Sequence, residues 1–370
     1  MPFQSTTTQR NRTLIHPTLP QQQQQQSHGN NHDDNVNNKH LSQHSFVVCA
    51  DTQLGMTNNC AEWETEMDYS RQAVRRINAM EPKPLFCCVC GDLVDMETSM
   101  HLKRGFTKEQ CQDIKTRQNA DFQRVWANLD ERIALVCVCG NHDVGNRPTR
   151  ASIERFRSDF GDDYLAFWAN GTYNIVVNTN LFSDPTGAPE LYEKHLVWLE
   201  DRLCYGRENK ATCMFVFGHH PFFIYNPHET KEDMHGASAP PDECPEEWKK
   251  KLSGGVPDSY FPIPLERRKV ALALFRKYGV DACFSGHFHQ NMVSKTDWGM
   301  QMIITSSLSM VFESSGRPKD FNEPCTRGWR IVTVETTHVK DTKEEEEEDG
   351  DRGDTTKETQ TKFFHRFESL

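Results

Sequence analysis

Short apolar runs recur along the chain, and each of them ends at a turn that opens with polar residues or glycine. The runs are rich in β-branched and aromatic residues, which favour strands. They are Phe46–Cys49, Leu85–Cys90, Ile133–Val138, Cys213–Phe217 and Ala282–Phe284. Between the first two runs, apolar residues recur at helical spacing, namely Trp63, Met67, Val74 and Ile77. This alternation predicts strand–helix–strand units and an α/β fold.

The second half of the chain continues the pattern with one change of strand direction. Asn170-Gly171 separates two apolar stretches and predicts a two-residue hairpin turn, so we expect the sheet to become antiparallel there. Helices are predicted over Leu191–Leu203 and Leu265–Tyr278, and further strands over Met302–Thr305 and Trp329–Val334. Residues 225–264 form a proline-rich insertion without periodicity, which is either a substrate-selecting lid or an inert surface loop.

The two ends of the chain differ from the middle in composition. Residues 1–43 are rich in Gln, Asn, Thr and His, and they hold too few apolar side chains to offset the entropy of ordering, so we expect disorder there. Near the other end, Thr361–Phe367 alternates polar and aromatic residues, which predicts a final strand paired with Trp329–Val334. Residues 338–358 are then an acidic loop, and residues 44–370 a single domain.

Charge and cysteine usage restrict the partners and the compartment. The chain has 42 basic and 53 acidic residues, a net charge of −11. Most of that excess lies in the acidic run at 341–354, and no basic footprint for nucleic acid remains. No apolar run approaches the roughly 18 residues of a membrane span. Eight of the 13 cysteines lie in or beside apolar strands, which is typical of buried free thiols in a reducing compartment, so we predict a cytoplasmic protein.

Side chains that can bind metals follow all five of the first apolar runs. The segments are Asp51-Thr52-Gln53, Gly91-Asp92, Gly140-Asn141-His142-Asp143, Gly218-His219-His220-Pro221 and Gly286-His287-Phe288-His289. Carboxylate, amide and imidazole ligands without thiolates suit Mn²⁺, Fe or Zn²⁺. Two such ions about 3.5 to 4 Å apart can bind a bridging hydroxide and hold a phosphoryl oxygen. A two-metal site needs a bridging carboxylate, and Asp92 is the residue that we predict for it.

These five segments, in this order, resemble the motifs of the calcineurin-like metallophosphoesterases over roughly Phe46–Val334. The resemblance implies a two-sheet β-sandwich flanked by helices and a dinuclear metal centre. It also implies that Asp51 and His289 hold the first metal with Asp92 bridging, while Asn141, His219 and His287 complete the second. His142 would protonate the leaving alkoxide.

Within the family, the chain is most similar to the calcineurin-like phosphoesterase domain-containing subgroup of the complete S-transactivated protein type, whose members are serine/threonine phosphatases. The resembling segments are Asp51–Gly55, Gly140–Thr149, Gly161–Tyr164 and Ser285–His287, with His365-Arg366 near the end.

Two positions depart from the wider family pattern. Gln53 stands where most members have histidine, so the first metal would be held through an amide oxygen, through a water, or more weakly. Met96 stands where the large protein-phosphatase branch has an arginine that holds phosphate. Arg147 is either a replacement for that arginine or an ordinary solvated side chain. Asp95 either orients His142 or caps the following segment, and His220 is read as structural because His219 fills the ligand position.

The leading functional prediction is hydrolysis of phosphoserine or phosphothreonine in proteins, by attack of the metal-bridging hydroxide with His142 as general acid. One alternative is a nucleotide or small-molecule phosphodiesterase at the same centre. The other is a metal-binding scaffold without turnover, which predicts loss of the catalytic histidine. His142 is present in this chain.

Overall fold

The fold is taken from a computed structural model, which describes residues 13–15, 39–230, 258–312, 325–339 and 359–370. Within this part of the chain the strands form two sheets. One has seven strands in the order β1-β5-β6-β7-β8-β10-β9, and the other has five in the order β12-β11-β2-β3-β4. Both sheets are mixed, because parallel β2-β3-β4 and β6-β7-β8 are extended by antiparallel strands.

The strands have the following bounds. They are β1 Thr13–Ile15, β2 Lys39–Cys49, β3 Phe86–Val89, β4 Ala134–Cys137, β5 Leu165–Ala169, β6 Thr172–Val176, β7 Cys213–Phe217, β8 Ala282–Ser285, β9 Met292–Lys295, β10 Gln301–Ile304, β11 Gly328–Val339 and β12 Thr359–Ser369. The predicted hairpin at Asn170-Gly171 is confirmed, and both turn residues have positive φ. The predicted final strand is also confirmed, because β12 pairs antiparallel with β11 over its whole length.

The helices have the following bounds. They are α1 Glu64–Asn78, α2 Thr98–Lys103, α3 Lys108–Trp126, α4 Asn141–Val144, α5 Arg150–Phe160, α6 Thr179–Ser183, α7 Pro189–Glu208 and α9 Leu265–Tyr278, with short 3-10 turns η2 Met56–Asn58, η3 Pro185–Gly187 and η5 Asp258–Tyr260. None of the described helices is both long enough and apolar enough to cross a membrane.

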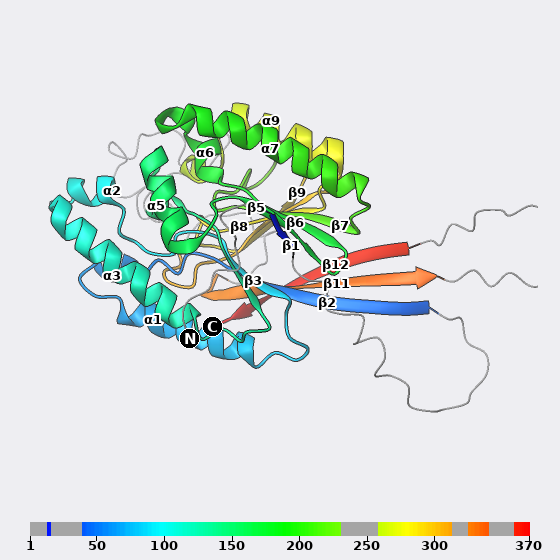
Figure 1. The fold of residues 1–370 in the computed structure, drawn as a ribbon, viewed down its shortest axis with the longest axis horizontal. Coiled ribbons are helices and arrows are strands. Elements are labelled where there is room, and N and C mark those ends of the chain that lie inside the picture. Colours follow the sequence, from blue (N-terminus) through cyan, green and yellow to red (C-terminus); the bar gives the residue numbers. More distant parts are fainter. Residues whose placement is uncertain (1–12, 16–38, 231–257, 313–324, 340–358) are drawn as a thin grey trace, which may run out of the picture.

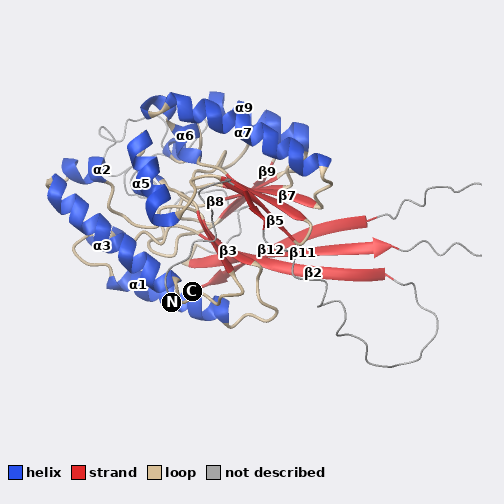
Figure 2. Ribbon diagram, viewed as in Figure 1, coloured by secondary structure: helices blue, strands red, loops and turns tan. Residues whose placement is uncertain are grey.

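Figures 1 and 2 show the two sheets between two layers of helices, with α1 and α3 on one side and α7 and α9 on the other. Alternate strand residues face opposite layers, so the central strands β3, β4, β6, β7 and β8 are buried on both faces, and most of their residues are apolar. Phe46, Phe86, Phe217 and Phe284 fill the space between the sheets. Phe46 stacks on Phe86 with ring centroids 4.6 Å apart. The architecture is therefore the helix-flanked two-sheet sandwich that the resemblance implied.

The N-terminal boundary has to be corrected. We expected disorder through residue 43, but β2 begins at Lys39 and pairs with β11 down to Val339. Thr13–Ile15 also forms a short strand beside β5. Backbone hydrogen bonds to a neighbouring strand hold these segments, and a polar composition does not reveal such bonds. Residues 1–12 and 16–38 lie outside the described part of the chain.

Two further predicted segments are described only at their ends. In the insertion at 225–264, residues 231–257 lie outside the described part, whereas its two ends are joined by a hydrogen bond from the Tyr225 hydroxyl to Asp258 at 2.7 Å. The acidic loop predicted at 338–358 begins two residues later, because β11 reaches Val339, and it ends as predicted, because β12 begins at Thr359. Residues 340–358 lie outside the described part.

Candidate metal centre and catalytic site

The metal-type side chains lie in loops at the carboxyl ends of five parallel strands, which is where open α/β sheets place their ligands. Strands β2, β3 and β4 of one sheet lead to Asp51, Asp92 and Asn141, whereas β7 and β8 of the other lead to His219 and His287. The loops meet because the two sheets pack face to face. The site is therefore assembled from both sheets.

Backbone conformation aims several of these side chains. Positive φ angles, which are rare outside glycine, occur at five of the predicted ligands, Asp51 (50°), Gln53 (38°), Asp92 (48°), His287 (66°) and His289 (56°). Each such residue costs on the order of 1 to 3 kcal/mol and persists only where surrounding structure enforces it. Here the enforcement includes hydrogen bonds from the Asp51 amide to the Gly91 carbonyl at 3.1 Å and from the Gln53 amide to the Asp92 carbonyl at 2.8 Å.

Glycine is required where one ligand loop passes directly against another. A Cβ on Gly140 would lie 2.1 Å from Oδ1 and 2.2 Å from the backbone nitrogen of Asp92. A Cβ on Gly286 would lie 2.4 Å from Oδ2 of Asp51. The motif glycines therefore allow the close approach of the loops, and this explains their place beside the ligand residues.

One group of ligands surrounds Nε2 of His219. This nitrogen is 2.9 Å from Oδ1 of Asn141, 3.1 Å from Nδ1 of His287 and 3.3 Å from Oδ1 of Asp92. Asp92, Asn141 and His219 are buried completely or almost so. Four ligand atoms of three different kinds thus converge on one small volume without solvent.

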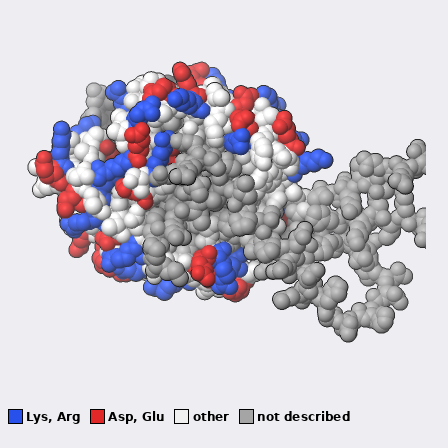
Figure 3. Space-filling model, in the orientation of Figure 1, with Lys and Arg blue, Asp and Glu red and all other residues white. Residues whose placement is uncertain are grey.

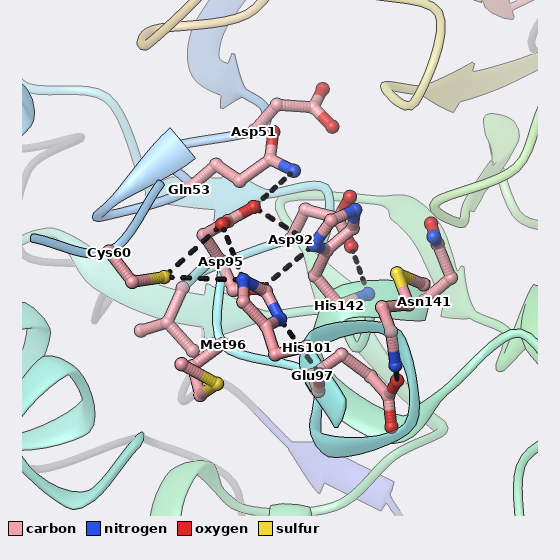
Figure 4. A network of polar contacts seen from close by, with 12 residues as sticks. Asp51, Gln53, Cys60, Asp92, Asp95, Met96, Glu97, His101, Asn141 and His142 are labelled. Atoms are coloured by element: carbon pink, nitrogen blue, oxygen red, sulfur yellow. Dashed lines mark hydrogen bonds and ion pairs between the residues drawn. The ribbon is translucent and has the colours of Figure 1, made fainter. Parts of the chain in front are cut away.

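A second group lies around Asp51. Its Oδ1 is 3.5 Å from Nε2 of His289, and its carboxylate accepts a hydrogen bond from the His287 amide at 3.0 Å. Gln53 lies beside it, with its Nε2 donating to Asp95 at 3.3 Å and its Oε1 buried without a hydrogen-bond partner in the described structure (Figure 4). The unpaired amide oxygen is the atom that would bind a metal.

The histidine hydrogen bonds fit metal binding. A backbone carbonyl can only accept, so Nδ1 of His219, 2.8 Å from the Cys90 carbonyl, carries the proton. Nδ1 of His289 is held in the same way by the Met310 carbonyl at 2.5 Å. Each ring then directs Nε2 toward a carboxylate, an arrangement in which the nitrogen and a carboxylate oxygen can bind the same divalent cation. The residues present therefore fit two divalent ions.

His142 lies beside the ligands and is oriented by Asp95. Its amide donates to Oδ1 of Asp92 at 2.8 Å, and its Nδ1 lies 2.9 Å from the backbone oxygen and 3.0 Å from Oδ1 of Asp95. Burial lowers the pKa of His142, but Asp92 and Asp95 outweigh it and raise the pKa to about 10. Burial likewise opposes ionisation of Asp95, yet its hydrogen bonds to His101 and His142 hold its pKa below the usual range. Bound cations would oppose protonation of the nearby His142.

Buried polar residues on neighbouring segments hold these loops in place. Carboxylate oxygens of Asp143 accept hydrogen bonds from the amides of Leu93 and Gly140, at 3.1 Å and 2.7 Å. The ammonium group of Lys115, on α3, donates to the carbonyls of His142 and Asp143 at 3.0 Å and 2.9 Å. Lys115 could not be predicted as part of the site, because a single lysine in a polar helix resembles a solvated one.

The remaining predicted residues are placed as follows. His220 is buried, and its amide donates to Oγ1 of Thr179 at 2.9 Å, as expected for a structural residue. Arg147 is exposed, and the described structure records no hydrogen bond or ion pair between it and the ligands. Its role as a phosphate clamp stays a prediction.

Sequence reasoning also missed a tyrosine of the site. Tyr260, at the end of the insertion, lies with its ring centroid 5.3 Å from that of His287 and its hydroxyl 3.3 Å from Oδ1 of Asn146. No motif precedes it, and only the fold brings it to the metal centre.

Comparison with known proteins agrees with this geometry. The sequence profile of the calcineurin-like phosphoesterases matches residues 44–291. The serine/threonine-protein phosphatase CPPED1 of Danio rerio is 33% identical over 305 residues, covering 80% of this chain and 82% of that protein. CPPED1 of Bos taurus is 32% identical over 303 residues, covering 80% of this chain and 81% of that protein. A purple acid phosphatase from yellow lupin shares the fold, with a TM-score of 0.53 and 11% identity over 86% of this chain and 53% of that one.

The profile match covers more than half of the chain, and the buried cluster of carboxylates and imidazoles is what such a protein needs. The class is thus that of the metal-dependent phosphoesterases. The chain belongs to the calcineurin-like phosphoesterase family and is related to the CPPED1 serine/threonine phosphatases.

Proposed function

We propose that this chain hydrolyses phosphomonoesters, and that its substrates are phosphoserine or phosphothreonine side chains of proteins. The observation that carries the proposal is the placement of His142 against the bridging-type carboxylate Asp92, with Nδ1 engaged by Asp95. The relatives named serine/threonine-protein phosphatases support the choice of substrate.

Two divalent ions, such as Mn²⁺, Fe or Zn²⁺, would be held by seven residues. These are Asp51, Gln53, Asp92, Asn141, His219, His287 and His289. When bound, such ions activate water as a nucleophile and neutralise phosphoryl oxygens.

The chain's own contribution to bond cleavage is proton transfer by His142. Because Nδ1 is held by Asp95, Nε2 is the nitrogen that can donate a proton to the departing serine or threonine oxygen. Asp95 fixes the orientation of the ring, and its carboxylate favours the protonated form of His142. A serine alkoxide is a poor leaving group, so this transfer matters most for the substrate class proposed.

One face of the molecule fits a protein substrate better than a nucleic acid. On the face drawn in Figure 3, basic and acidic side chains are interspersed, without a continuous basic stripe in its described part. The twelve described cysteines are free thiols, which supports the prediction that the protein works in the cytoplasm.

The test compares three substrates at saturating Mn²⁺: a phosphoserine peptide, an aryl phosphomonoester and an aryl phosphodiester. We expect turnover of both monoesters, weak turnover of the diester, and loss of all turnover in Asp92→Asn. The matched control is Asp113→Asn, an exposed aspartate on α3 whose loss should change nothing. A preference for the diester would replace the proposal with a phosphodiesterase, and metal binding without any turnover would replace it with a scaffold.

A further inference from the structure

A second buried cluster of metal-type side chains lies behind the catalytic histidine. Cys60 follows η2, Asp95 follows β3, and His101 lies in α2. Sγ of Cys60 is 3.3 Å from Oδ2 of Asp95 and 3.4 Å from Nε2 of His101, and the last two atoms are 3.3 Å apart. The three side chains are 3%, 0% and 0% exposed. Figure 4 shows them pointing toward one another.

The hydrogen bonds around His101 assign its protons. Nδ1 lies 2.8 Å from the backbone oxygen of Glu97, which can only accept, so Nδ1 carries a proton. Nε2 then either presents a lone pair or carries a second proton. Nε2 lies 3.4 Å from Nη1 of Arg104 and 3.3 Å from Oδ2 of Asp95, so the guanidinium favours a lone pair there and the carboxylate favours a proton. His219 and His289 in the dinuclear centre are held by backbone carbonyls in the same way.

The sulfur of Cys60 donates one hydrogen bond, to Asp95, and accepts another, from Gln118. Oε1 of Gln118 accepts from the Met96 amide at 2.9 Å, so its Nε2 is the atom that faces Sγ, at 3.4 Å. A donor aimed at sulfur stabilises a thiolate. Asp95 adds a carboxylate oxygen that accepts the S–H of Cys60 at 3.3 Å, so sulfur, imidazole and carboxylate meet in a closed volume. A divalent ion that displaces the thiol proton would find ligand atoms of all three kinds here.

We propose that Cys60, Asp95 and His101 bind a third divalent ion, of the Zn²⁺ type, separate from the dinuclear centre. Bonds of about 2.0 to 2.3 Å in tetrahedral geometry place ligand atoms roughly 3.3 to 3.6 Å apart, and the separations here agree. The thiolate selects Zn²⁺ over Mn²⁺. On binding, the Cys60 thiol gives up its proton to solvent as the S–metal bond forms. A water molecule can complete the tetrahedron.

The site would act through Asp95. Oδ2 of Asp95 faces Cys60 and His101, whereas Oδ1 faces His142 and Gln53. An ion bound to Oδ2 would fix the carboxylate and so the ring of His142. Asp95 would then be a positioning residue that joins the structural ion to the general acid.

Cobalt provides the test, because a thiolate bound to Co²⁺ gives a near-ultraviolet charge-transfer band and the dinuclear centre contains no thiolate. We expect metal-free protein titrated with Co²⁺ to show this band. The band should be lost in Cys60→Ser and in His101→Asn, each of which should also bind one ion fewer than the wild type. It should persist in Asp92→Asn, which disables only the dinuclear centre.

The matched control is the double variant Cys204→Ser/Cys325→Ser, which removes the two described cysteines that are not buried. It should keep the band. A wild-type protein that binds Co²⁺ without the band, or a band that survives in Cys60→Ser, would overturn the proposal. Since the first reading needs no substitution, a variant that fails to fold leaves the test decisive.

Discussion

The two ends of strand β2 have different roles: one end leads into the metal centre, and the other belongs to a regular part of the sheet. Its carboxyl end leads into Asp51, where the chain takes a positive φ and polar groups are buried. Its other end belongs to an arm made of residues 39–45 of β2, 333–339 of β11 and 359–364 of β12, which extends from the body in Figure 1. The strands of the arm pair in regular register, and none of its described residues has a positive φ angle. Backbone strain is therefore concentrated at the metal centre, whereas regular strand pairing in the arm stabilises the fold.

Removing β12 tests the stabilising half of this comparison and should have the largest effect. Deletion of residues 359–370 removes the strand that pairs with β11. It also removes the contact between Phe363 and Phe215, whose ring centroids are 5.2 Å apart. We expect a loss of at least about 4 kcal/mol in the free energy of unfolding, or failure to fold. Urea unfolding followed by circular dichroism measures it. Unchanged stability would show that the strand is dispensable.

Gly140→Ala tests the strained half. The new Cβ would clash with Asp92 at about 2 Å, so the two ligand loops must separate. We expect loss of bound metal and of turnover, with a smaller loss of stability than the β12 deletion causes. Metal analysis and circular dichroism on the same sample separate the two effects. Gly105→Ala is the control, because its Cβ meets nothing within 4 Å and only its positive φ is strained, at about 1 kcal/mol.

The variant His142→Ala tests whether catalysis at the metal centre includes proton transfer to the leaving group. Because His142 is not a predicted ligand, the variant should keep its metal. We expect kcat for a phosphoserine peptide to fall roughly 10²- to 10⁴-fold. The fall should be much smaller for an activated aryl phosphate, whose leaving group needs little protonation. An equal loss on both substrates would contradict the general-acid role.

The smallest expected effect concerns the base of the arm. Nδ1 of His365 lies 2.9 Å from Nη1 of Arg330, and its Nε2 lies 3.2 Å from Oε1 of Gln301, so the folded state holds a neutral ring. Burial and the charge of Arg330 lower its pKa from 6.5 to about 4. The unfolded state then binds more protons between these values, so stability is full above about pH 6.5 and falls as the pH drops toward 4.

His365→Gln should remove part of that acid sensitivity, on the order of 1 kcal/mol across the window. Free energies of unfolding at pH 7 and pH 4.5, measured for both proteins, give the difference. Identical pH dependence would show that His365 does not titrate as described, and turnover at pH 7 should be unchanged in either case.

Much of this comparison could be predicted from the sequence, by two different signals. At the metal centre, apolar runs followed by glycine and a residue that can bind metal predicted the ligand loops. Strands that are buried on both faces are continuously apolar and are therefore easy to recognise. At the base of the arm, the alternation of Phe363 and its neighbours predicted β12 and its pairing partner. Both signals depend on residues that are close together in the chain.

The rest depends on contacts that the sequence does not encode locally. The first residues of β2 are polar and were read as disordered, although β11 supplies their hydrogen bonds. Tyr260 reaches His287 only in the folded chain, and Cys60 and His101 contact Asp95 from a loop and from helix α2. Gln53 was placed beside the first metal, and only the fold shows that its Nε2 faces Asp95. From the sequence, only the residues of the recognised motifs could be predicted to come together from distant loops.

The account depends most directly on the ligand role of Asp92, which joins the two sheets' contributions. The decisive measurement is the metal content of the purified chain, reconstituted with Mn²⁺ in parallel with Asp92→Asn. We predict two tightly bound Mn²⁺ ions per chain in the wild type, and loss of bound metal together with phosphopeptide turnover in the variant. A variant that keeps both ions would contradict the assignment of Asp92 and the centre built around it.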